Sequence, residues 1–462
     1  MSLTLKAARQ ALSKQIGDFW EGTTTSAGNA DKLDLIDSTL TGHQSTWVTS
    51  GAGGEQPSTV LITDTELNKE ERYVDSDNLT TASGTIGVTR AFTVLIPTIK
   101  TYEIHKEFTA ADKERAIKWT CYDAFPSLYK LIDDSSLRFG DWLRDGGFET
   151  WTSSAVLTRW ANDTTQANTL AQTSTEFVRT GTYSCKFTGG GSGSFICQGW
   201  NQGSATHDTN NIDMQHLAGK TVTFRVWGFS ATANALTISL EDGTTSTYGN
   251  HTSHSSSTKV YHPGDSTWRL MEVTKTNTAN PLAIEARIYN DTTSAVYVDD
   301  ASLTGIGDKM TYDISDLGLY NHQPNQIYAV SNRAANDTTP RPKDSIVLLD
   351  NWSTATSSGL LTFKTRITDG KALRIVGRGY LTQPADAGVN TEASWTSTEV
   401  TAPQDEIIVA GAAMYLYRLL ISTSQLGDVD RYKMLADYWE KEYRIRKARY
   451  GMASLAGTIL RG

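Results

Sequence analysis

The segment Thr221-Val222-Thr223-Phe224-Arg225-Val226-Trp227 alternates polar and apolar residues along its whole length. Such alternation is typical of a strand that buries one face, because successive side chains point to opposite sides. Similar segments recur at 183–187, 236–240, 268–273, 282–289 and 295–298, and Gly, Asn, Asp and Ser turns separate them. Almost nothing between residues 141 and 305 has helical periodicity. We therefore predict that 141–305 is an all-β sandwich or jelly roll.

Helical periodicity occurs before and after this module instead. Thr4 can cap the first predicted helix, and Thr109 with Asp112 forms a capping-box pattern at the start of the second, which Pro126 is expected to bend or end. The elements expected in the flanks are a helix at 3–20, a β region at 34–104, a helix from about 109 to 128, a β region at 305–401, and helices at 405–423 and 428–450.

This order predicts one α+β body that is split in sequence, with the sandwich inserted as a separate module. The expected fold class is α+β with an inserted all-β module, that is, a discontinuous helical/β body plus a β-sandwich (jelly roll) domain. The expected parts are 1–140 (helix, β region, helix), 141–305 (the sandwich) and 306–462 (β region, two terminal helices).

Composition excludes several classes of protein. The net charge of -9 argues against a nucleic-acid binder by bulk charge. The chain has three cysteines, Cys121, Cys185 and Cys197. This count is small and uneven, which argues against a disulfide framework, so buried thiols are expected. The N-terminus lacks the apolar core of a signal peptide, and the longest apolar stretch, 407–421, is short for a membrane span and contains Arg418. We expect a soluble protein made in the cytoplasm that does not contact a membrane.

Common catalytic motifs are missing: the sequence has no HExxH, P-loop, GxSxG or GxGxxG. The run 189–194 (GGGSGS) resembles a phosphate loop but lacks its lysine, so a hairpin loop is favoured. His251, His254 and His262 invite a metal reading, but they lie in a Ser/Thr-rich stretch, where a solvated loop is the better interpretation.

Two pairs of carboxylates lie at the ends of the predicted sandwich, Asp145 with Glu149 and Asp299 with Asp300. A glycosidase needs two carboxyl groups that flank a sugar, and the sequence leaves that pairing open. A structural role, with a cation bound by oxygen ligands, is the more natural interpretation because both pairs lie on terminal strands that must meet. We therefore expect no enzyme.

Tryptophans are numerous in the module. Trp227 and Trp268 lie within alternating strands and are expected in the core. Trp160 and Trp200 lie in looser context, so they are the better candidates for exposed rings that stack on sugar faces.

The last helix has the one clear charge asymmetry of the chain. A solvated helix face is the default interpretation, and contact with an acidic partner or with passing DNA is the alternative. Seven basic residues lie between 431 and 450, against Asp437, Glu440 and Glu442: Arg431, Lys433, Lys441, Arg444, Arg446, Lys447 and Arg449.

The module resembles the carbohydrate-binding-module jelly rolls of bacterial polysaccharide-degrading enzymes. The resemblance rests on Gly146-Gly147-Phe148-Glu149 at its start, on Gly181-Thr182-Tyr183-Ser184, 217–224 and Thr267-Trp268-Arg269 inside it, and on 297–303 (YVDDASL) at its end. In such modules the opening Glu and a closing Asp often hold a structural calcium. The resemblance thus implies a calcium at Glu149 and Asp300, and no cofactor is otherwise required.

The flanks resemble head-to-tail adaptor (neck, connector) proteins of tailed bacteriophages, on residues 112–117 (DKERAI), 373–377 (LRIVG) and 406–417 (EIIVAGAAMYLY). This resemblance implies a virion structural protein, made in the host cytoplasm, that forms a homo-oligomeric ring (a dodecamer) in the neck. Its partners would be the portal protein and downstream neck or tail proteins. The basic helix would dock on the portal or line the DNA channel, and the jelly roll would face outward, where it could hold host glycans.

A tail-fibre or receptor-binding protein whose jelly roll binds host-surface carbohydrate is the alternative. The absence of repeats argues against it, since fibres usually have long repetitive shafts. A polysaccharide-active enzyme ranks third, because the sequence shows no catalytic domain.

Overall fold

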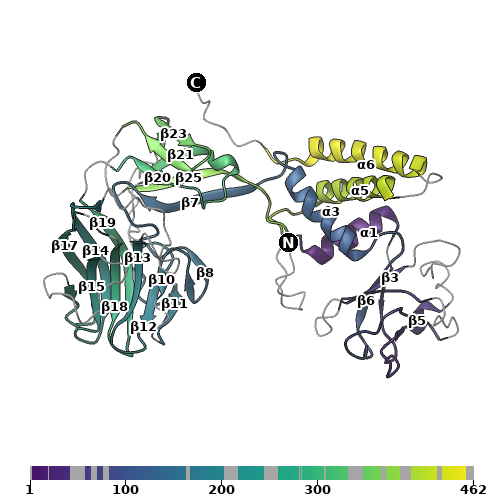
Figure 1. Cartoon of the computed structure of the whole chain (residues 1–462), viewed down its shortest axis with the longest axis horizontal. Helices are drawn as coiled ribbons and strands as arrows, with labels where there is room; N and C mark the ends of the chain where they lie inside the picture. Colours follow the sequence, from purple (N-terminus) through teal and green to yellow (C-terminus); the bar gives the residue numbers. More distant parts are fainter. Residues whose placement is uncertain are drawn as a thin grey trace. The chain divides into compact units, whose positions relative to one another are not determined.

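The computed structural model describes residues 3–18, 20–41, 58–63, 70–75, 83–162, 167–201, 217–243, 259–279, 281, 283–305, 309–330, 347–365, 371–384, 397–423 and 429–453. These residues form two compact units (Figure 1). The first unit contains the described residues up to Lys130 and from Gly379 onward, and the second contains those from Leu131 to Arg378.

Helices of the first unit pack around one hydrophobic core, to which Leu12, Ile117, Ile408 and Trp439 contribute. They are α1 (Leu5–Ile16), α3 (Ala110–Asp123), α5 (Asp405–Thr423) and α6 (Val429–Tyr450). Helices α5 and α6 run alongside each other (Figure 1). Each helix lies where the periodicity predicts one, so these predictions are confirmed.

Both expected N-caps are also present. The Oγ1 of Thr4 accepts a hydrogen bond from the amide of Ala7 at 3.2 Å, and the Oγ1 of Thr109 accepts one from the amide of Asp112 at 3.1 Å. Each bond satisfies one backbone donor that the first turn of a helix leaves without a partner. Helix α3 ends before Pro126, as expected, because proline lacks the amide that a helix interior requires.

Short strands form the remainder of the first unit, and their core includes Leu35, Val60, Ile86 and Tyr102. The expected strands near 71–74, 85–88 and 101–104 are present, whereas the one expected at 47–49 lies outside the described residues. One sheet has the order β1 (Trp20–Thr23), β6 (Thr101–His105), β3 (Thr59–Ile62), β4 (Glu71–Tyr73), and a two-stranded sheet pairs β2 (Asp34–Ile36) with β5 (Thr85–Gly87).

The predicted sandwich is present in the second unit as two five-stranded antiparallel sheets. Their order joins strands far apart in sequence, as in a jelly roll. The first sheet is β10 (Ala161–Asn162), β13 (Ser194–Asn201), β18 (Ala283–Asn290), β15 (Leu236–Gly243), β16 (Lys259–Tyr261). The second sheet is β11 (Thr169–Thr173), β12 (Ser184–Thr188), β19 (Ala295–Thr304), β14 (Thr221–Ser230), β17 (Thr267–Thr276).

One hydrophobic core fills the sandwich, and its members run from Trp142 to Leu303. Val222, Phe224 and Val226 of β14 are all fully buried in it. Their spacing of two residues matches the alternation of the sequence, which places the intervening residues on the outer face of the sheet. A small hairpin, β8 (Trp151–Ser153) with β9 (Val156–Leu157), adjoins the sandwich.

The second unit also contains two smaller sheets with a core of their own, to which Leu137, Tyr312, Ile327 and Ile375 contribute. The compact units therefore do not follow the expected borders at 140 and 305, because strands on both sides of the sandwich pair with each other. The first of these sheets has the order β20 (Thr311–Asp313), β24 (Leu360–Phe363), β23 (Trp352–Ala355). The second has the order β22 (Val347–Leu349), β21 (Pro324–Val330), β25 (Ala372–Gly379), β7 (Lys130–Arg138).

Among the described helices, none is both long enough and apolar enough to cross a bilayer. Cys121, Cys185 and Cys197 are buried thiols that form no disulfide, as expected, and burial raises the pKa of the Cys121 thiol to about 12.

Candidate functional site

The ends of the sandwich meet at Asp300, a residue expected to bind calcium. Its Oδ1 lies 3.0 Å from Nη2 of Arg138 and accepts a hydrogen bond from the Thr180 hydroxyl at 2.7 Å. Its Oδ2 lies 2.5 Å from Nη1 of Arg179. Two guanidinium groups thus supply the positive charge that a calcium ion would bring, and they occupy both carboxylate oxygens.

Glu149, the other expected calcium ligand, is also committed to the protein. Its Oε1 accepts hydrogen bonds from the amides of Thr182 (2.9 Å) and Tyr183 (3.3 Å). It lies close to Gly181, where an added Cβ would come within 1.7 Å of Oε1. Among the described residues, no group of three or more His, Cys, Asp or Glu side chains is arranged to hold a metal. Asp300, with a guanidinium group at each of its two oxygens, therefore does not fit a calcium site.

The remaining carboxylates of the two pairs, Asp145 and Asp299, are buried and bind backbone amides. Asp145 accepts hydrogen bonds from the amides of Glu149 (2.8 Å) and Thr150 (3.0 Å), and Asp299 accepts two from Arg179 and Thr180. Burial raises the pKa of Asp145 to about 7, and burial together with the neighbouring Asp300 raises that of Asp299 to about 7.

Two other segments were expected to be loops: the run 189–194 and the stretch that contains His251, His254 and His262. The run 189–194 connects β12 to β13, which belong to different sheets, so it is a link between sheets and not the expected hairpin. His262 is fully buried, and its Nδ1 accepts a hydrogen bond from the amide of Gly264 at 2.9 Å. His251 and His254 lie outside the described residues.

Trp160 does not present its ring to solvent, so the expected exposure is wrong. The side chain is 3 % exposed, its ring stacks on Phe148 at 5.0 Å, and its Nε1 donates to the backbone oxygen of Asp145 at 3.1 Å. The looser sequence context hid this, because the partners of Trp160 come from the segment that opens the sandwich. Trp200 belongs to β13, but its side chain lies outside the described residues.

An accessible group of aromatic rings lies instead on the outer face of the second sheet. We call it the aromatic face, and it consists of Phe177, Trp227, Phe229, Trp268 and Tyr297. Phe177 is 43 % exposed, the three residues from β14 and β17 are half-buried, and Tyr297 is buried at 7 % exposure. The register of the sheet pairs Phe229 with Trp268 on one side and with Tyr297 on the other, so their rings form a row across three strands.

Ring contacts hold this row together. Phe177 stacks on Phe229 with ring centroids 4.0 Å apart and contacts Tyr297 at 4.6 Å. Phe229 in turn lies 6.1 Å from Trp268. Adjacent aromatic rings at such distances stabilise one another and stay ordered.

The expectation that Trp227 and Trp268 belong to the core is therefore wrong. Trp227 follows Val226, which is fully buried, and so has the opposite parity in β14. The alternation of the sequence contained this information, because Val222, Phe224 and Val226 already filled the inner positions.

Charged groups surround the aromatic face. The guanidinium of Arg179 lies 3.6 Å from the ring centroid of Trp227, while its other contact is Asp300. The Lys186 ammonium lies 5.7 Å from the ring of Tyr297, whose hydroxyl donates to Glu176 at 3.0 Å. Burial, followed by the bond to Glu176, raises the pKa of Tyr297. Flat apolar rings with hydrogen-bonding groups at their border can hold a ligand that has both apolar and polar faces.

The outer face of the first sheet is different, because its charged residues are enclosed. Arg287 of β18 lies 2.9 Å from Oε2 of Glu241 and 2.5 Å from Oε2 of Glu285, and all three side chains are at least 96 % buried. Tyr289 is also buried and receives a hydrogen bond from Arg287 at 3.1 Å. Burial alone would lower the pKa of Arg287, but Glu285, Tyr289 and Glu241 raise it, so the guanidinium stays charged. Sequence reasoning missed this cluster, although Glu285 and Arg287 alternate with apolar residues of β18.

The basic residues of α6 are divided among several partners. Arg444 pairs with Glu440 within the helix, and the Lys447 ammonium donates to the backbone oxygen of Asp123 at 3.2 Å. Lys433 lies 4.0 Å from Asp430. Arg431, Lys441 and Arg449 are exposed.

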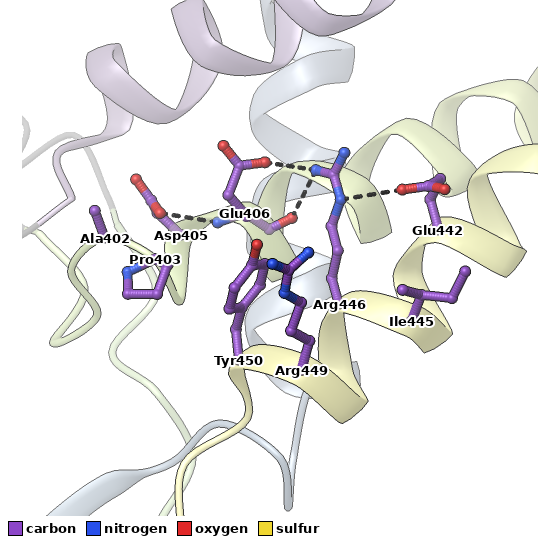
Figure 2. A pocket seen from close by; sticks show the side chains of 9 residues that line it. All are labelled: Ala402, Pro403, Asp405, Glu406, Glu442, Ile445, Arg446, Arg449 and Tyr450. Carbon is purple, nitrogen blue, oxygen red and sulfur yellow. Dashed lines mark hydrogen bonds and ion pairs between the residues drawn. The ribbon is translucent and has the colours of Figure 1, made fainter.

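Arg446 lines a pocket of about 490 Å³ between the start of α5 and the end of α6 (Figure 2). Its guanidinium lies 2.6 Å from Glu406 and 3.5 Å from Glu442. Arg449 is the only other basic residue among the lining side chains, which also include Asp405. Three carboxylates face two guanidinium groups, so this pocket is not suited to an anion such as a DNA phosphate.

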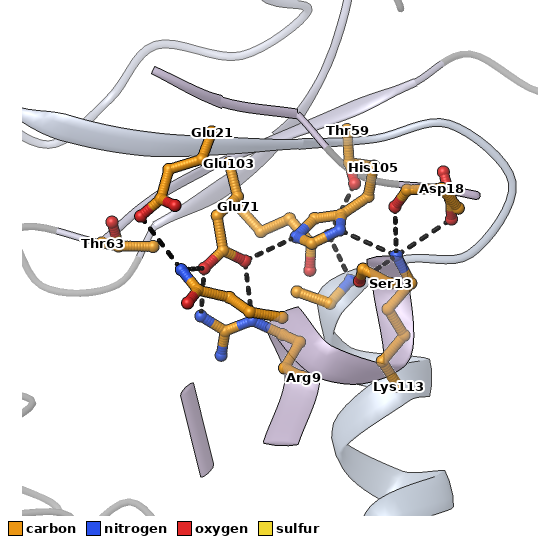
Figure 3. A network of polar contacts seen from close by, with 12 residues as sticks. Arg9, Ser13, Asp18, Glu21, Thr59, Thr63, Glu71, Glu103, His105 and Lys113 are labelled. Carbon is orange, nitrogen blue, oxygen red and sulfur yellow. Dashed lines mark hydrogen bonds and ion pairs between the residues drawn. The ribbon is translucent and has the colours of Figure 1, made fainter. Parts of the chain in front are cut away.

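A buried network of charges joins α1, α3 and β6 in the first unit (Figure 3). Arg9 pairs with Glu103 at 2.8 Å, and Lys113 lies 2.9 Å from Asp18. His105 connects the two pairs: its Nδ1 lies 2.9 Å from the Lys113 ammonium and its Nε2 lies 3.1 Å from Glu103. Because an ammonium can only donate, Nδ1 accepts and the proton of the neutral ring is on Nε2. Burial and the positive charge of Lys113 lower the pKa of His105.

No protein-family model matches the chain, and no curated protein matches it. Several solved structures are similar over somewhat more than a third of this chain. The C-terminal family 22 carbohydrate-binding module of Clostridium thermocellum Xyn10B is 13 % identical, with a TM-score of 0.26, over 37 % of this chain and 96 % of that one. The CBM22-1 xylan-binding domain of Paenibacillus barcinonensis Xyn10C is 10 % identical, with a TM-score of 0.25, over 38 % and 98 %.

A third similar structure is the enzymatically active domain of tailspike protein 4 of bacteriophage CBA120. It is 10 % identical, with a TM-score of 0.22, over 37 % of this chain and 21 % of that one. Similarity at this level carries no argument about function. The fold rests on the strand order and register given above.

Proposed function

We propose that the chain is a binding protein, not an enzyme, and that its jelly roll binds glycans through the aromatic face. The half-buried rings of Phe229 and Trp268, with the exposed ring of Phe177 stacked on Phe229, are the observation that supports this proposal. The C–H face of a pyranose is apolar, so it stacks on such rings, while its hydroxyl groups reach the hydrogen-bonding groups beside them.

Two features of the face affect the strength of the interaction in opposite directions. The rings are ordered by contacts with each other, so binding costs little side-chain entropy. The nearby charged groups, Glu176, Arg179 and Lys186, lie at the border, where solvent screens them. We therefore expect specificity to come from shape and hydroxyl arrangement, with millimolar to micromolar affinity for one site.

A glycan array probed with the full chain tests the proposal, with xylohexaose and β-1,4-galactotriose among the soluble oligosaccharides. The variant Trp268→Ala is expected to weaken the binding of any hit by roughly tenfold or more. Tyr261→Ala is the matched control, because Tyr261 is 47 % exposed on the edge of the other sheet. Absence of binding at millimolar sugar would remove the proposal, and loss in Tyr261→Ala alone would move the site to the first sheet.

We further propose that the first unit serves as a head-to-tail adaptor in the neck of a tailed-phage virion. Support comes from the order of its described elements, helix, β region, helix and terminal helical pair, and from the single core in which α1, α3, α5 and α6 pack. In this proposal, copies form a ring that binds the portal, and the jelly roll faces outward.

The mass of the purified protein mixed with its portal tests the adaptor proposal. A ring of defined copy number, a dodecamer by the resemblance, is the expected result. A trimer that ignores the portal would favour the tail-fibre alternative, in which the jelly roll binds host-surface carbohydrate.

A further inference from the structure

One side of α6 is exposed although it contains large apolar side chains. Met434 is 73 % exposed, Tyr438 54 % and Ile445 47 %. The opposite side of the same helix packs into the core of the first unit through Ala436, Trp439 and Tyr443, among other residues. Scattered exposed apolar residues are ordinary, but three on one line of a helix form a surface suited to a partner.

The exposed residues follow the spacing of a coiled-coil seam. Steps of four, three, four and three residues lead from Met434 through Tyr438, Lys441 and Ile445 to Ala448, and all five are exposed. In heptad terms, Tyr438 and Ile445 are at a positions, and Met434, Lys441 and Ala448 are at d positions. The seam spans 15 residues, or about 21 Å of helix from the first to the last. A helix with such a seam is complementary to another helix of the same kind.

The charges beside the seam distinguish between the two orientations of a pair of identical helices. In a parallel pair, g positions face the following e positions, so Asp437 would meet Glu442 of the other copy and Arg444 would meet Arg449. Both contacts join like charges. A parallel pair is therefore disfavoured on both flanks.

In an antiparallel pair the g positions of the two helices face each other. Asp437 of each copy then lies beside Arg444 of the other, and both contacts join opposite charges. Arg444 is 76 % exposed on the side chain and so is free to turn toward a partner, while Glu440 keeps its contact with Arg418.

The layers of the seam also match in the antiparallel orientation. A two-fold axis between Tyr438 and Lys441 places Met434 of one copy against Ile445 of the other, twice. It also places each Tyr438 ring against the Lys441 of the other copy, where the ammonium can lie over the ring. A single polar residue in the seam, here Lys441, typically fixes the register of a coiled coil at some cost in stability.

We propose that two copies of this chain associate through α6, with the helices antiparallel and the two-fold axis between Tyr438 and Lys441. The contact is isologous, so it closes at a dimer. A ring such as the adaptor proposal requires needs a different, head-to-tail contact. The dimer is thus a property of the free protein and is independent of glycan binding. It also joins two jelly rolls in one particle.

Disulfide trapping of the full chain tests the orientation. The variants Met434→Cys and Ile445→Cys are oxidised mildly, each alone and as an equal mixture, and non-reducing gels report covalent dimers. The native cysteines are buried, so the parent chain serves as the control. The antiparallel pair predicts a covalent dimer in the mixture and at most a trace with either variant alone. Dimers with each variant alone would show a parallel pair and overturn the proposal, as would the absence of dimers in all three samples.

Sedimentation velocity over a range of concentrations tests the charge pairs. The substitution Arg444→Asp is expected to raise the dissociation constant of the dimer by roughly tenfold, since it turns two attractive contacts into repulsive ones. Adding Asp437→Arg to it should restore the affinity of the parent. A parent chain that stays monomeric at the highest concentration would contradict the proposal. This outcome includes the case in which the seam binds the portal and not a second copy of the chain. A dimer that persists unchanged in Met434→Lys would do the same.

Discussion

The Nη2 of Arg138 lies 3.0 Å from the Oδ1 of Asp300, although 162 residues separate them in the sequence. Arg138 ends β7, before the sandwich, and Asp300 belongs to β19, its last strand. Their ion pair ties the two ends of the sandwich together. Arg179 adds a second bond to Asp300 and continues to Trp227 of the aromatic face. The guanidinium of Arg179 therefore links the ion pairs that hold the ends of the sandwich together to the aromatic face.

Replacing Arg138 by alanine is expected to lower the free energy of unfolding of the second unit by about 1–3 kcal/mol, because Asp300 loses a charged hydrogen bond in a place that solvent barely reaches. Arg269→Ala is the control: its pair with Asp265 lies on the surface, so its loss should cost at most about 0.5 kcal/mol. Urea unfolding followed by tryptophan fluorescence measures both. Equal effects would show that the Arg138 pair does not fasten the sandwich.

Chelators are expected to leave the melting temperature of the protein unchanged. The reason is that two guanidinium groups already balance the charge of Asp300 and two amides bind Oε1 of Glu149, so the ends of the sandwich are held together without a calcium ion. Differential scanning calorimetry with and without EDTA, after dialysis against calcium, measures this. A fall of several degrees in EDTA would restore the calcium that the resemblance implies.

Gly181→Ala should destabilise the second unit more than Gly318→Ala does. Both glycines have left-handed φ angles, +69° and +73°, so both substitutions impose about 1 kcal/mol of backbone strain. At Gly181 the new Cβ would also come within 1.7 Å of Glu149, whereas nothing lies within 4 Å at Gly318. We expect an additional loss of about 1–2 kcal/mol for Gly181→Ala in chemical unfolding. Similar losses would mean that Glu149 moves aside freely.

The second unit is expected to lose stability as the pH rises from 4 to 7. The pKa of Asp145 and that of Asp299 are raised from 3.8 to about 7, so the folded state favours the protonated carboxyl groups. Their contribution is complete below pH 3.8 and is lost as the pH passes 7. Burial lowers the pKa of Lys309 from 10.5 to about 7. The stability that its neutral form provides is therefore complete above pH 10.5 and is lost as the pH falls to 7. Calorimetry should therefore show a minimum of stability near pH 7.

The variant Asp145→Asn isolates one of these groups. It should flatten the slope between pH 4 and 7, because the amide does not titrate in this range. The same slope in the variant and the parent would show that Asp145 is not responsible.

The first unit should respond to acid in the opposite direction. Burial and Lys113 hold the pKa of His105 below its usual 6.5, so the folded state favours the neutral ring. The stability that this provides is present above pH 6.5 and is lost as the pH falls through the lower pKa of the folded state. Protonation would also point a second N–H at the Lys113 ammonium. Hydrogen exchange of α1 and α3 at pH 7 and pH 5 measures the effect, and lower protection factors are expected at pH 5 once the slower intrinsic exchange at that pH is divided out.

His105→Gln should remove most of this pH dependence, whereas His322→Gln, in the second unit, should leave it unchanged. Equal slopes in the two variants would assign the acid sensitivity to other groups.

Local patterns in the sequence determined the elements of this protein. Alternation at 221–227 specifies a strand and also which residues share a face, because the period of two is a property of the extended backbone. Thr4 and Thr109 specify helix starts, because their hydroxyls reach amides only three residues away. The same alternation also predicts that Trp227 lies on the outer face of the sheet, and only the usual preference of tryptophan for the core argued against this.

Tertiary structure alone decided the partners of the site residues. Trp160 is buried because the segment that opens the sandwich covers it, and Asp300 meets Arg138 and Arg179 because three distant segments converge. Burial and ion pairing depend on which side chains meet, and a chain of 462 residues offers far more pairings than local spacing can rank. The sequence by itself thus determined strands, helices and faces, whereas the packing of those faces decided which aromatic rings stay accessible and which carboxylates are bound by arginine.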